Sequence, residues 1–144
     1  MRRLVIDSSV SLKWWLDDEE HVVEAREILK QIHTGRIIPI VPDLWHYEVA
    51  NGIRTAVFRK RINKNQGKTY IDELLSMDFE TRSIVSYLPK AYAYAIKYKY
   101  AIYDISYAVL AEQQKIDFVT DDERFFNAVK EDLKFVYHLS GFLL

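Results

Sequence analysis

Cysteine is missing from the 144 residues of this chain, and glycine and proline are scarce. The absence of cysteine excludes disulfides, thiolate zinc sites and cysteine nucleophiles, and it is typical of a reducing compartment. With only four glycines and three prolines, the chain contains no glycine-rich phosphate-binding loop. We therefore expect a cytoplasmic protein whose chemistry depends on other residue types.

Long apolar runs and a strong charge of one sign are also missing. The first apolar run, Leu4 to Ile6, is too short for a signal sequence, and no later run approaches the roughly 18 residues of a membrane helix. Twenty basic residues oppose 21 acidic ones, which leaves a net charge of −1. No membrane association is expected, and any nucleic-acid site must be local because the whole chain has no electrostatic preference for a polyanion.

The chain is 49% hydrophobic and 14% aromatic, which suits one globular domain over residues 1–144. Most of the aromatic surplus, including seven tyrosines between residues 87 and 107, is expected in the core or at an interface. Short apolar, β-branched runs alternate with longer amphipathic segments, which is the pattern of a parallel sheet covered by helices. Strands are expected at 4–6, 37–41, 81–85, 117–120 and 134–137, and helices at 8–15, 19–33, 44–59, 64–77, 86–99, 104–114 and 122–130. Right-handed crossovers then give an α/β fold, a three-layer α/β/α sandwich with a mainly parallel five-stranded sheet.

Acidic residues that are far apart in the chain fall at the same edge of this sheet. They follow a strand directly or lie near the start of a helix: Asp7, Glu48, Asp104 and Asp122. Open α/β sheets bind their ligands at this edge. Clustered carboxylates repel one another and need protons or a shared cation, and oxygen ligands without cysteine or spaced histidines favour Mg²⁺ or Mn²⁺. Each acid alone is also explained as a helix cap or a solvated side chain, so the prediction depends on their joint placement.

Short segments of the sequence carry a family resemblance. They are Asp-Ser-Ser-Val at 7–10, Glu-Val-Ala-Asn at 48–51, Tyr-Asp at 103–104 leading into Tyr-Ala-Val-Leu-Ala at 107–111, and Thr-Asp-Asp-Glu-Arg-Phe at 120–125. In this order and spacing the chain resembles PIN-domain ribonucleases, and among them the VapC-like toxins of toxin–antitoxin pairs. The resemblance implies an endoribonuclease that cleaves single-stranded RNA with Mg²⁺ or Mn²⁺. It also implies homodimers and a small antitoxin protein that covers the active site.

The resemblance makes the four acids the catalytic metal ligands. A metal held there would activate a water for attack on the phosphodiester, so no RNA 2′-hydroxyl is required; Glu48 or Asp104 could accept the proton of that water. The family's fourth motif reads Thr, any residue, Asp, and here the middle residue is acidic too. Strand alternation places Thr120 and Asp122 on one side and Asp121 on the other. Asp122 is therefore the expected ligand, with Asp121 as the alternative.

Neighbouring polar and basic residues are candidates for supporting roles. Ser8, Ser9 and Thr120 have hydroxyls at the same edge, and Asn51 lies one helical turn beyond Glu48, although capping or surface exposure explains them equally well. Basic residues without an intervening acid run from 54 to 68: Arg54, Arg59, Lys60, Arg61, Lys64 and Lys68. This stretch is a candidate RNA-binding surface, led by the first four, or an ordinary solvated face.

Other functions remain open at this point. A PIN-like fold can bind RNA or protein without cleaving it, and a nuclease of this type can process RNA without an antitoxin. A phosphoaspartyl phosphatase is disfavoured because Ser9 stands where that chemistry needs a second aspartate. The RNA target cannot be derived from the sequence.

Overall fold

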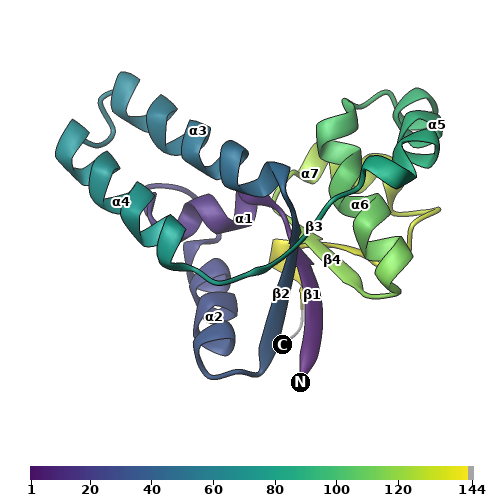
Figure 1. The fold of residues 1–144 in the computed structure, drawn as a ribbon, viewed down its shortest axis with the longest axis horizontal. Helices are drawn as coiled ribbons and strands as arrows, with labels where there is room; N and C mark the ends of the chain where they lie inside the picture. Colours follow the sequence, from purple (N-terminus) through teal and green to yellow (C-terminus); the bar gives the residue numbers. More distant parts are fainter. Residues whose placement is uncertain (143–144) are drawn as a thin grey trace.

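The fold is built on a sheet of five parallel strands (Figure 1). The structure is a computed structural model, and it describes residues 1–142. The strands are β1 (Arg2–Ile6), β2 (Ile37–Pro42), β3 (Glu80–Arg82), β4 (Asp117–Thr120) and β5 (Val136–His138), in the order β3-β2-β1-β4-β5. Because every neighbouring pair is parallel, the carboxyl ends of all five strands meet at one edge.

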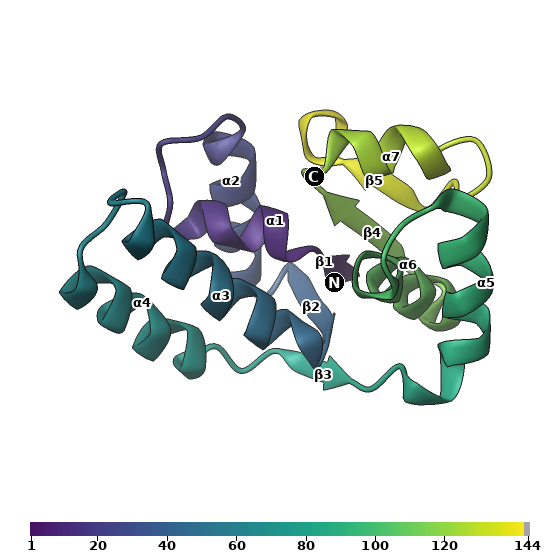
Figure 2. The same ribbon diagram turned by 90° about the horizontal axis from the view of Figure 1, so that it is seen from above.

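Helices cover both faces of this sheet. They are α1 (Ser8–Ser11), α2 (Val22–His33), α3 (Leu44–Phe58), α4 (Lys64–Ser76), α5 (Leu88–Tyr98), α6 (Ile102–Gln114) and α7 (Glu123–Val129), with 3₁₀ turns η1 (Leu12–Trp14), η2 (Val85–Tyr87) and η3 (Leu139–Gly141). In Figures 1 and 2, α1 to α4 lie on one side of the sheet and α5 to α7 on the other. The chain moves from β1 to β2 to β3 in one direction and then crosses back to β4, so right-handed connections place the two groups on opposite faces. The predicted three-layer α/β/α sandwich is confirmed.

The core lies between the central strands and the helices. Leu4, Val5 and Ile6 of β1 are fully buried, as expected for a strand that has neighbours on both sides and helices on both faces. Trp45 is also fully buried, and its indole N–H donates to Ser11 Oγ at 2.9 Å. Most of the aromatic surplus is buried or packs partly against this core: Trp14, Trp15, Tyr87, Tyr94, Tyr98, Tyr100 and Tyr107. Two tyrosines of the run, Tyr92 and Tyr103, are exposed.

Several element boundaries differ from the sequence-based expectation. The third strand ends at Arg82 instead of residue 85, because Ser83 Oγ accepts the N–H of Val85 and starts η2. The fifth strand is shifted to Val136–His138. The second helix begins at Val22 instead of residue 19 because the preceding turn passes through His21, which has a φ of 62°. No helix within residues 1–142 is long and apolar enough to cross a membrane.

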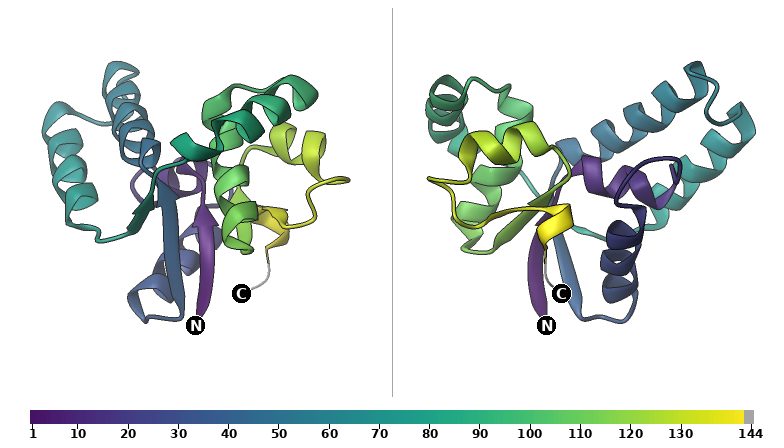
Figure 3. Two further views of the ribbon diagram at one scale, coloured as in Figure 1. Left: turned by 45° about the vertical axis from the view of Figure 1, so that its right-hand side comes forward. Right: turned by 180° about the vertical axis from the view of Figure 1, so that it is seen from behind.

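The order of the strands reverses between β1 and β4. The chain leaves β1 toward β2 on one side and later returns to β4 on the other side, and ligand sites of open α/β sheets lie at the carboxyl end of such a reversal. Figure 3 shows α3 and α4 projecting beyond this edge as a helical hairpin, with α5 and α6 on the opposite side of the sheet. The residues that follow β1 and β4 are therefore the first to consider as a functional site.

Candidate active site

Asp7 lies at the carboxyl end of β1, at the reversal point. Its backbone N–H donates to the carbonyl oxygen of Val119 at 3.0 Å, which extends the pairing of β1 with β4. Its Oδ2 accepts hydrogen bonds from Thr120 Oγ1 at 2.6 Å and from Ser9 Oγ at 2.8 Å. Burial raises the pKa of Asp7 from 3.8 to about 6, against the lowering effect of these two hydrogen bonds. Asp7 is thus a deeply placed carboxyl group with hydroxyl donors and no basic partner within 4 Å among residues 1–142.

The two hydroxyls that hold Asp7 are themselves held by the backbone. Ser9 Oγ accepts the N–H of Asp121 at 2.9 Å, and Thr120 Oγ1 accepts the N–H of Asp122 at 3.0 Å. Each hydroxyl therefore accepts from a main-chain N–H after β4 and donates to the carboxylate after β1. This network joins the segments at the ends of the two central strands through one aspartate.

Glu48 reaches the same edge from the second turn of α3. Its Oε1 accepts hydrogen bonds from Tyr107 OH at 2.6 Å and from Ser8 Oγ at 3.3 Å. Burial raises the pKa of Glu48 above its ordinary value, and the negative charge of Asp7 adds to this effect. Tyr107 is 1% exposed, and its ring stacks on Phe118 of β4 with a centroid separation of 5.7 Å. The glutamate is thus positioned by a rigid donor from α6, on the other face of the sheet.

Asp104 and Asp122 complete the group. Asp104 lies in the first turn of α6, whose N-cap is Ala101, so it is not the helix cap that the sequence allowed. Burial raises the pKa of Asp104, and the charge of Asp122 raises it further. Asp122 is the N-cap of α7, and its Oδ1 accepts the N–H of Phe125 at 3.0 Å. The charges of Asp104 and Asp122 both raise the pKa of Asp7, so these acids, together with Glu48, lie in one electrostatic neighbourhood.

The chemistry of this group fits a hard divalent cation. All the donors are oxygens, and none of the four acids forms an ion pair within residues 1–142. The acids surround the edge without converging tightly: in the described part of the chain, no three His, Cys, Asp or Glu side chains form a ready-made metal cage. Mg²⁺ keeps several waters and takes only one or two carboxylates directly, so spaced acids around a hydrated ion suit it.

Asp121, the alternative fourth ligand, is turned away from the other acids. Its Oδ2 pairs with Lys13 Nζ at 2.9 Å, and its Oδ1 contacts His21 Nδ1 at 3.1 Å and His138 Nε2 at 3.8 Å. Its carboxylate is therefore already compensated by basic side chains, whereas Asp122 accepts the N–H of Phe125 and forms no ion pair within residues 1–142. The assignment of Asp122 as the fourth ligand remains a prediction, and this geometry supports it.

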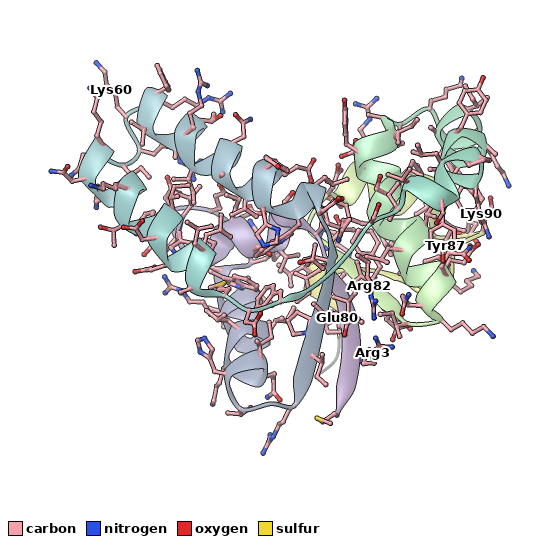
Figure 4. The ribbon with its side chains drawn as sticks, viewed as in Figure 1. Arg3, Lys60, Glu80, Arg82, Tyr87 and Lys90 are labelled. Atoms are coloured by element: carbon pink, nitrogen blue, oxygen red, sulfur yellow. The ribbon has the colours of Figure 1, made fainter. Side chains whose placement is uncertain are left out.

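The structure brings some of the predicted supporting residues into contact with the acids and leaves others away from them. Ser8 and Thr120 contact the acids as described above, but Asn51 is exposed and makes no side-chain hydrogen bond to Glu48. Among the basic residues, Arg61 pairs with Asp18 and Glu19. Figure 4 shows Lys60 at the far tip of the α3–α4 hairpin. The basic stretch thus leads away from the acids along α3 instead of surrounding them.

The rest of the stretch borders an apolar groove between α3 and α4. Arg54 places its guanidinium over the ring of Phe58, at 4.2 Å from the centroid, and Arg59 is exposed at the C-cap of α3. The groove has a volume of about 470 Å³ and a floor formed by residues such as Ile53 and Val57. Lys64 and Lys68 of α4, with Arg54 and Lys60, form its basic rim.

The fold is a parallel α/β sandwich, and its acidic residues lie where the strand order reverses. This is the place where open α/β sheets bind their ligands. Residues 4–131 match the family model of the PIN domain, and the chain therefore belongs to the PIN-domain family, as its motifs predicted. It is similar to Ribonuclease VapC3 of Pyrobaculum aerophilum, with 28% identity over 116 residues that cover 77% of this chain and 82% of the relative. The crystal structure of PAE2754 from Pyrobaculum aerophilum has the same fold, with a TM-score of 0.66 over 96% of this chain and 85% of that chain, at 19% identity.

Two residues of the site were not identified from sequence as part of it. Tyr107 was grouped with the core aromatics, and its hydroxyl contact with Glu48 follows only from the packing of α6 across β1 and β2. Lys13 was not singled out, although a lysine between Leu12 and Trp14 in an otherwise apolar turn was the available signal. A buried lysine requires a carboxylate partner, and the doubled aspartate at 121–122 offered one.

Proposed function

We propose that this protein is a Mg²⁺- or Mn²⁺-dependent endoribonuclease that cleaves single-stranded RNA, and that it is the toxin of a toxin–antitoxin pair. The observation that carries the proposal is the group of four acids, which come from four separate segments and share one electrostatic neighbourhood without forming an ion pair with any of residues 1–142. The similarity to a protein named as a ribonuclease supports RNA as the substrate.

The residues of the site divide the chemical work between them. A bound Mg²⁺ supplies a Lewis acid that lowers the pKa of a water and neutralises charge on the phosphate. Asp7 and Glu48 would be the rigid ligands, since four hydroxyl groups hold them: those of Thr120, Ser9, Tyr107 and Ser8. Asp104 is the best placed to accept a proton from the water, because no hydrogen bond among residues 1–142 engages its side chain and burial raises its pKa, as a general base requires.

Exposed aromatic side chains beside the acids support single-stranded RNA as the substrate. Tyr47 is 79% exposed and Tyr103 is 67% exposed, and they immediately precede Glu48 and Asp104 in the chain. Aromatic rings at the surface stack on bases that are not paired, and this contact tolerates any base. The two tyrosines thus offer one stacking surface on α3 and one on α6.

The groove between α3 and α4 supports a protein partner. Its floor is apolar and its rim carries Arg54, Lys60, Lys64 and Lys68, a combination that suits an amphipathic segment with acidic flanks. A phosphate backbone would leave the apolar floor unused. We therefore propose the small antitoxin protein as its occupant. Arg59, which lies outside the groove lining, and Lys60, which the groove shares with the hairpin tip, are the basic residues that we propose for RNA.

An apolar stripe on α5 supports a homodimer. Leu88, Tyr92 and Ile96 follow one another at four-residue intervals, and they are 39%, 61% and 63% exposed. Figure 4 shows Lys90 on this helix at the outer side of the molecule, together with Tyr87 of η2. Residues four apart share one helix face, so the stripe is continuous. Sedimentation of the wild type and of Tyr92→Glu tests the proposal: the wild type is expected to be a dimer and the variant a monomer.

The nuclease activity is tested with structured and unstructured RNAs incubated with and without Mg²⁺. Cleavage is expected only with the metal and only in unpaired regions. The Asp104→Asn variant should lose it, whereas Asp72→Asn, which changes an exposed acid on α4, should not. A single 2′-deoxy substitution at the cleaved position should leave cleavage intact, since water is the nucleophile. Metal-independent cleavage would contradict the mechanism, and RNA binding without cleavage would favour a binding module.

The role as a toxin has a separate test. Production of the wild type in a bacterial host should arrest growth, and production of Asp104→Asn at the same level should not. If this gene has a neighbour that encodes a small protein, co-production of that protein should restore growth, and the protein should co-purify with the wild type. Cleavage in vitro without growth arrest would favour a solitary RNA-processing nuclease.

A further inference from the structure

Lys13 is a buried charge beside the acidic site. It lies in η1 and is 2% exposed, and no other Lys, Arg, Asp or Glu within residues 1–142 is buried to that degree. Its Nζ contacts Asp121 Oδ2 at 2.9 Å and Glu19 Oε1 at 3.0 Å. A charge so deeply buried is tolerated only when it is paired, so this lysine and its carboxylates must be placed together when the chain folds.

The pair connects the two segments that supply the site. Lys13 follows α1, whose first residues are Ser8 and Ser9, and Asp121 directly precedes Asp122. While the side chain of Asp121 is held by Lys13, its backbone N–H donates to Ser9 Oγ, which in turn donates to Asp7. The ion pair thus fixes the residue whose main chain holds one of the two hydroxyls on Asp7.

The pair also keeps Asp121 apart from the acids. Asp121 and Asp122 carry the same carboxylate, and strand alternation directs the two side chains to opposite sides. Lys13 holds the first carboxylate on the far side, where His21 also contacts it at 3.1 Å. The second carboxylate then remains at the helix N-cap, close enough to raise the pKa of Asp104.

We propose that Lys13 is a positioning residue that sets the ligand arrangement of the site by holding Asp121 outside it. This inference rests on the proposed function, since it concerns the binding of the divalent cation. Within residues 1–142, Lys13 forms no hydrogen bond or ion pair with Asp7, Glu48, Asp104 or Asp122. Its effect is indirect: Lys13 holds Asp121, whose backbone N–H donates to the Ser9 hydroxyl on Asp7 and which directly precedes Asp122.

Positioning and simple electrostatics predict opposite results for the Lys13→Met variant. A nearby ammonium group repels a cation, so its removal alone would tighten Mn²⁺ binding. If Lys13 acts by positioning, its removal frees Asp121, disorders the hydroxyl network on Asp7 and weakens Mn²⁺ binding. Residues that orient metal ligands typically change metal affinity by about 10- to 100-fold, and we expect a loss in this range.

The experiment measures Mn²⁺ binding by calorimetry in four proteins: the wild type, Lys13→Met, Glu19→Gln and the double variant Lys13→Met/Asp121→Asn. Glu19→Gln removes the other partner of the same lysine and keeps the Lys13–Asp121 pair, so its affinity should match the wild type. The double variant has the net charge of the wild type and leaves no uncompensated carboxylate, so it should recover most of the loss. Unchanged or tighter binding by Lys13→Met, or equal losses for Glu19→Gln, would overturn the inference.

A metal-free readout separates this inference from the proposed function. The crystal structure of Lys13→Met without metal should show residues 120–122 displaced and the hydrogen bond from the Asp121 N–H to Ser9 broken. The structure of the double variant should show both restored. Absence of Mn²⁺ binding in the wild type would count against the proposed function alone, whereas an unmoved 120–122 segment in Lys13→Met would overturn the positioning role. If the single variant does not fold, the double variant decides: disorder there despite balanced charge also contradicts the inference.

Discussion

Replacement of Asp7 by asparagine should stabilise the metal-free protein at neutral pH. The folded protein raises the pKa of Asp7 from 3.8 to about 6 because burial disfavours its charged form. This difference corresponds to about 3 kcal/mol of stability lost when the group ionises. Asparagine is nearly isosteric and cannot ionise, and its oxygen can still accept from Thr120 and Ser9. Since Asp7 retains some access to solvent, we expect a net stabilisation of about 2 kcal/mol.

The pH dependence of this gain identifies its cause. A carboxyl group whose pKa is raised on folding binds its proton more tightly in the folded protein than in the unfolded chain. The wild type therefore loses stability relative to Asp7→Asn as the pH rises from 3.8 to about 6, and the difference is constant at higher pH. About half of the difference should remain at pH 5, and most of it should be gone near pH 4.

Urea unfolding in EDTA, followed by tryptophan fluorescence between pH 4 and 8, measures the effect. The exposed-site variant Asp72→Asn serves as the control and should track the wild type at every pH. In a parallel series without EDTA, Mn²⁺ should stabilise the wild type more than Asp7→Asn, since the variant lacks one of the four proposed ligands. A variant that is less stable than the wild type by the same amount across the whole pH range would refute the reasoning.

Other predictions concern the surroundings of the acids. Tyr107→Phe removes the hydroxyl that donates to Glu48 at 2.6 Å. The single-turnover cleavage rate should therefore fall by about 10- to 100-fold, while the free energy of unfolding changes by only about 1 kcal/mol. An unchanged rate would show that the hydroxyl is dispensable. Arg59→Ala/Lys60→Ala should lower the slope of log affinity for single-stranded RNA against log salt by about 1.4, measured by fluorescence anisotropy, and an unchanged slope would remove these residues from the RNA site. Gly52→Ala would place a Cβ 2.5 Å from a methyl carbon of Leu12, so despite better helix propensity it should lower the free energy of unfolding by about 1 kcal/mol, as read from urea midpoints.

The sheet and the meeting of the acids were predictable because they follow from topology. Apolar runs locate the strands, and residues that follow a parallel strand or lie near the start of a helix at the carboxyl ends of the strands come to one edge regardless of loop detail. Asp7, Glu48, Asp104 and Asp122 could therefore be placed together from positions spread over most of the chain. What could not be predicted was the number of residues in β3, since Ser83 ends that strand through a local hydrogen bond that competes with the ladder.

The contacts that hold the acids were less predictable, because they depend on side-chain direction across layers. The bond from Tyr107 to Glu48 joins helices on opposite faces of the sheet, and no local pattern encodes such a contact. The pair of Lys13 with Asp121 joins residues separated by more than 100 positions. Sequence alternation separated Asp121 from Asp122, but only the structure identifies the lysine that receives the outward-facing carboxylate.

The position of each acid in the sheet explains why the acids differ as experimental probes. Asp7 ends the central strand, where burial raises its pKa to about 6, and its replacement alters folding and function together. Asp104 lies in a helical turn at the rim, where no hydrogen bond in residues 1–142 holds its side chain and where its exposure limits the effect of replacement on folding. Loss of cleavage in Asp104→Asn can therefore be attributed to chemistry, whereas the same loss in Asp7→Asn requires the stability curve beside it.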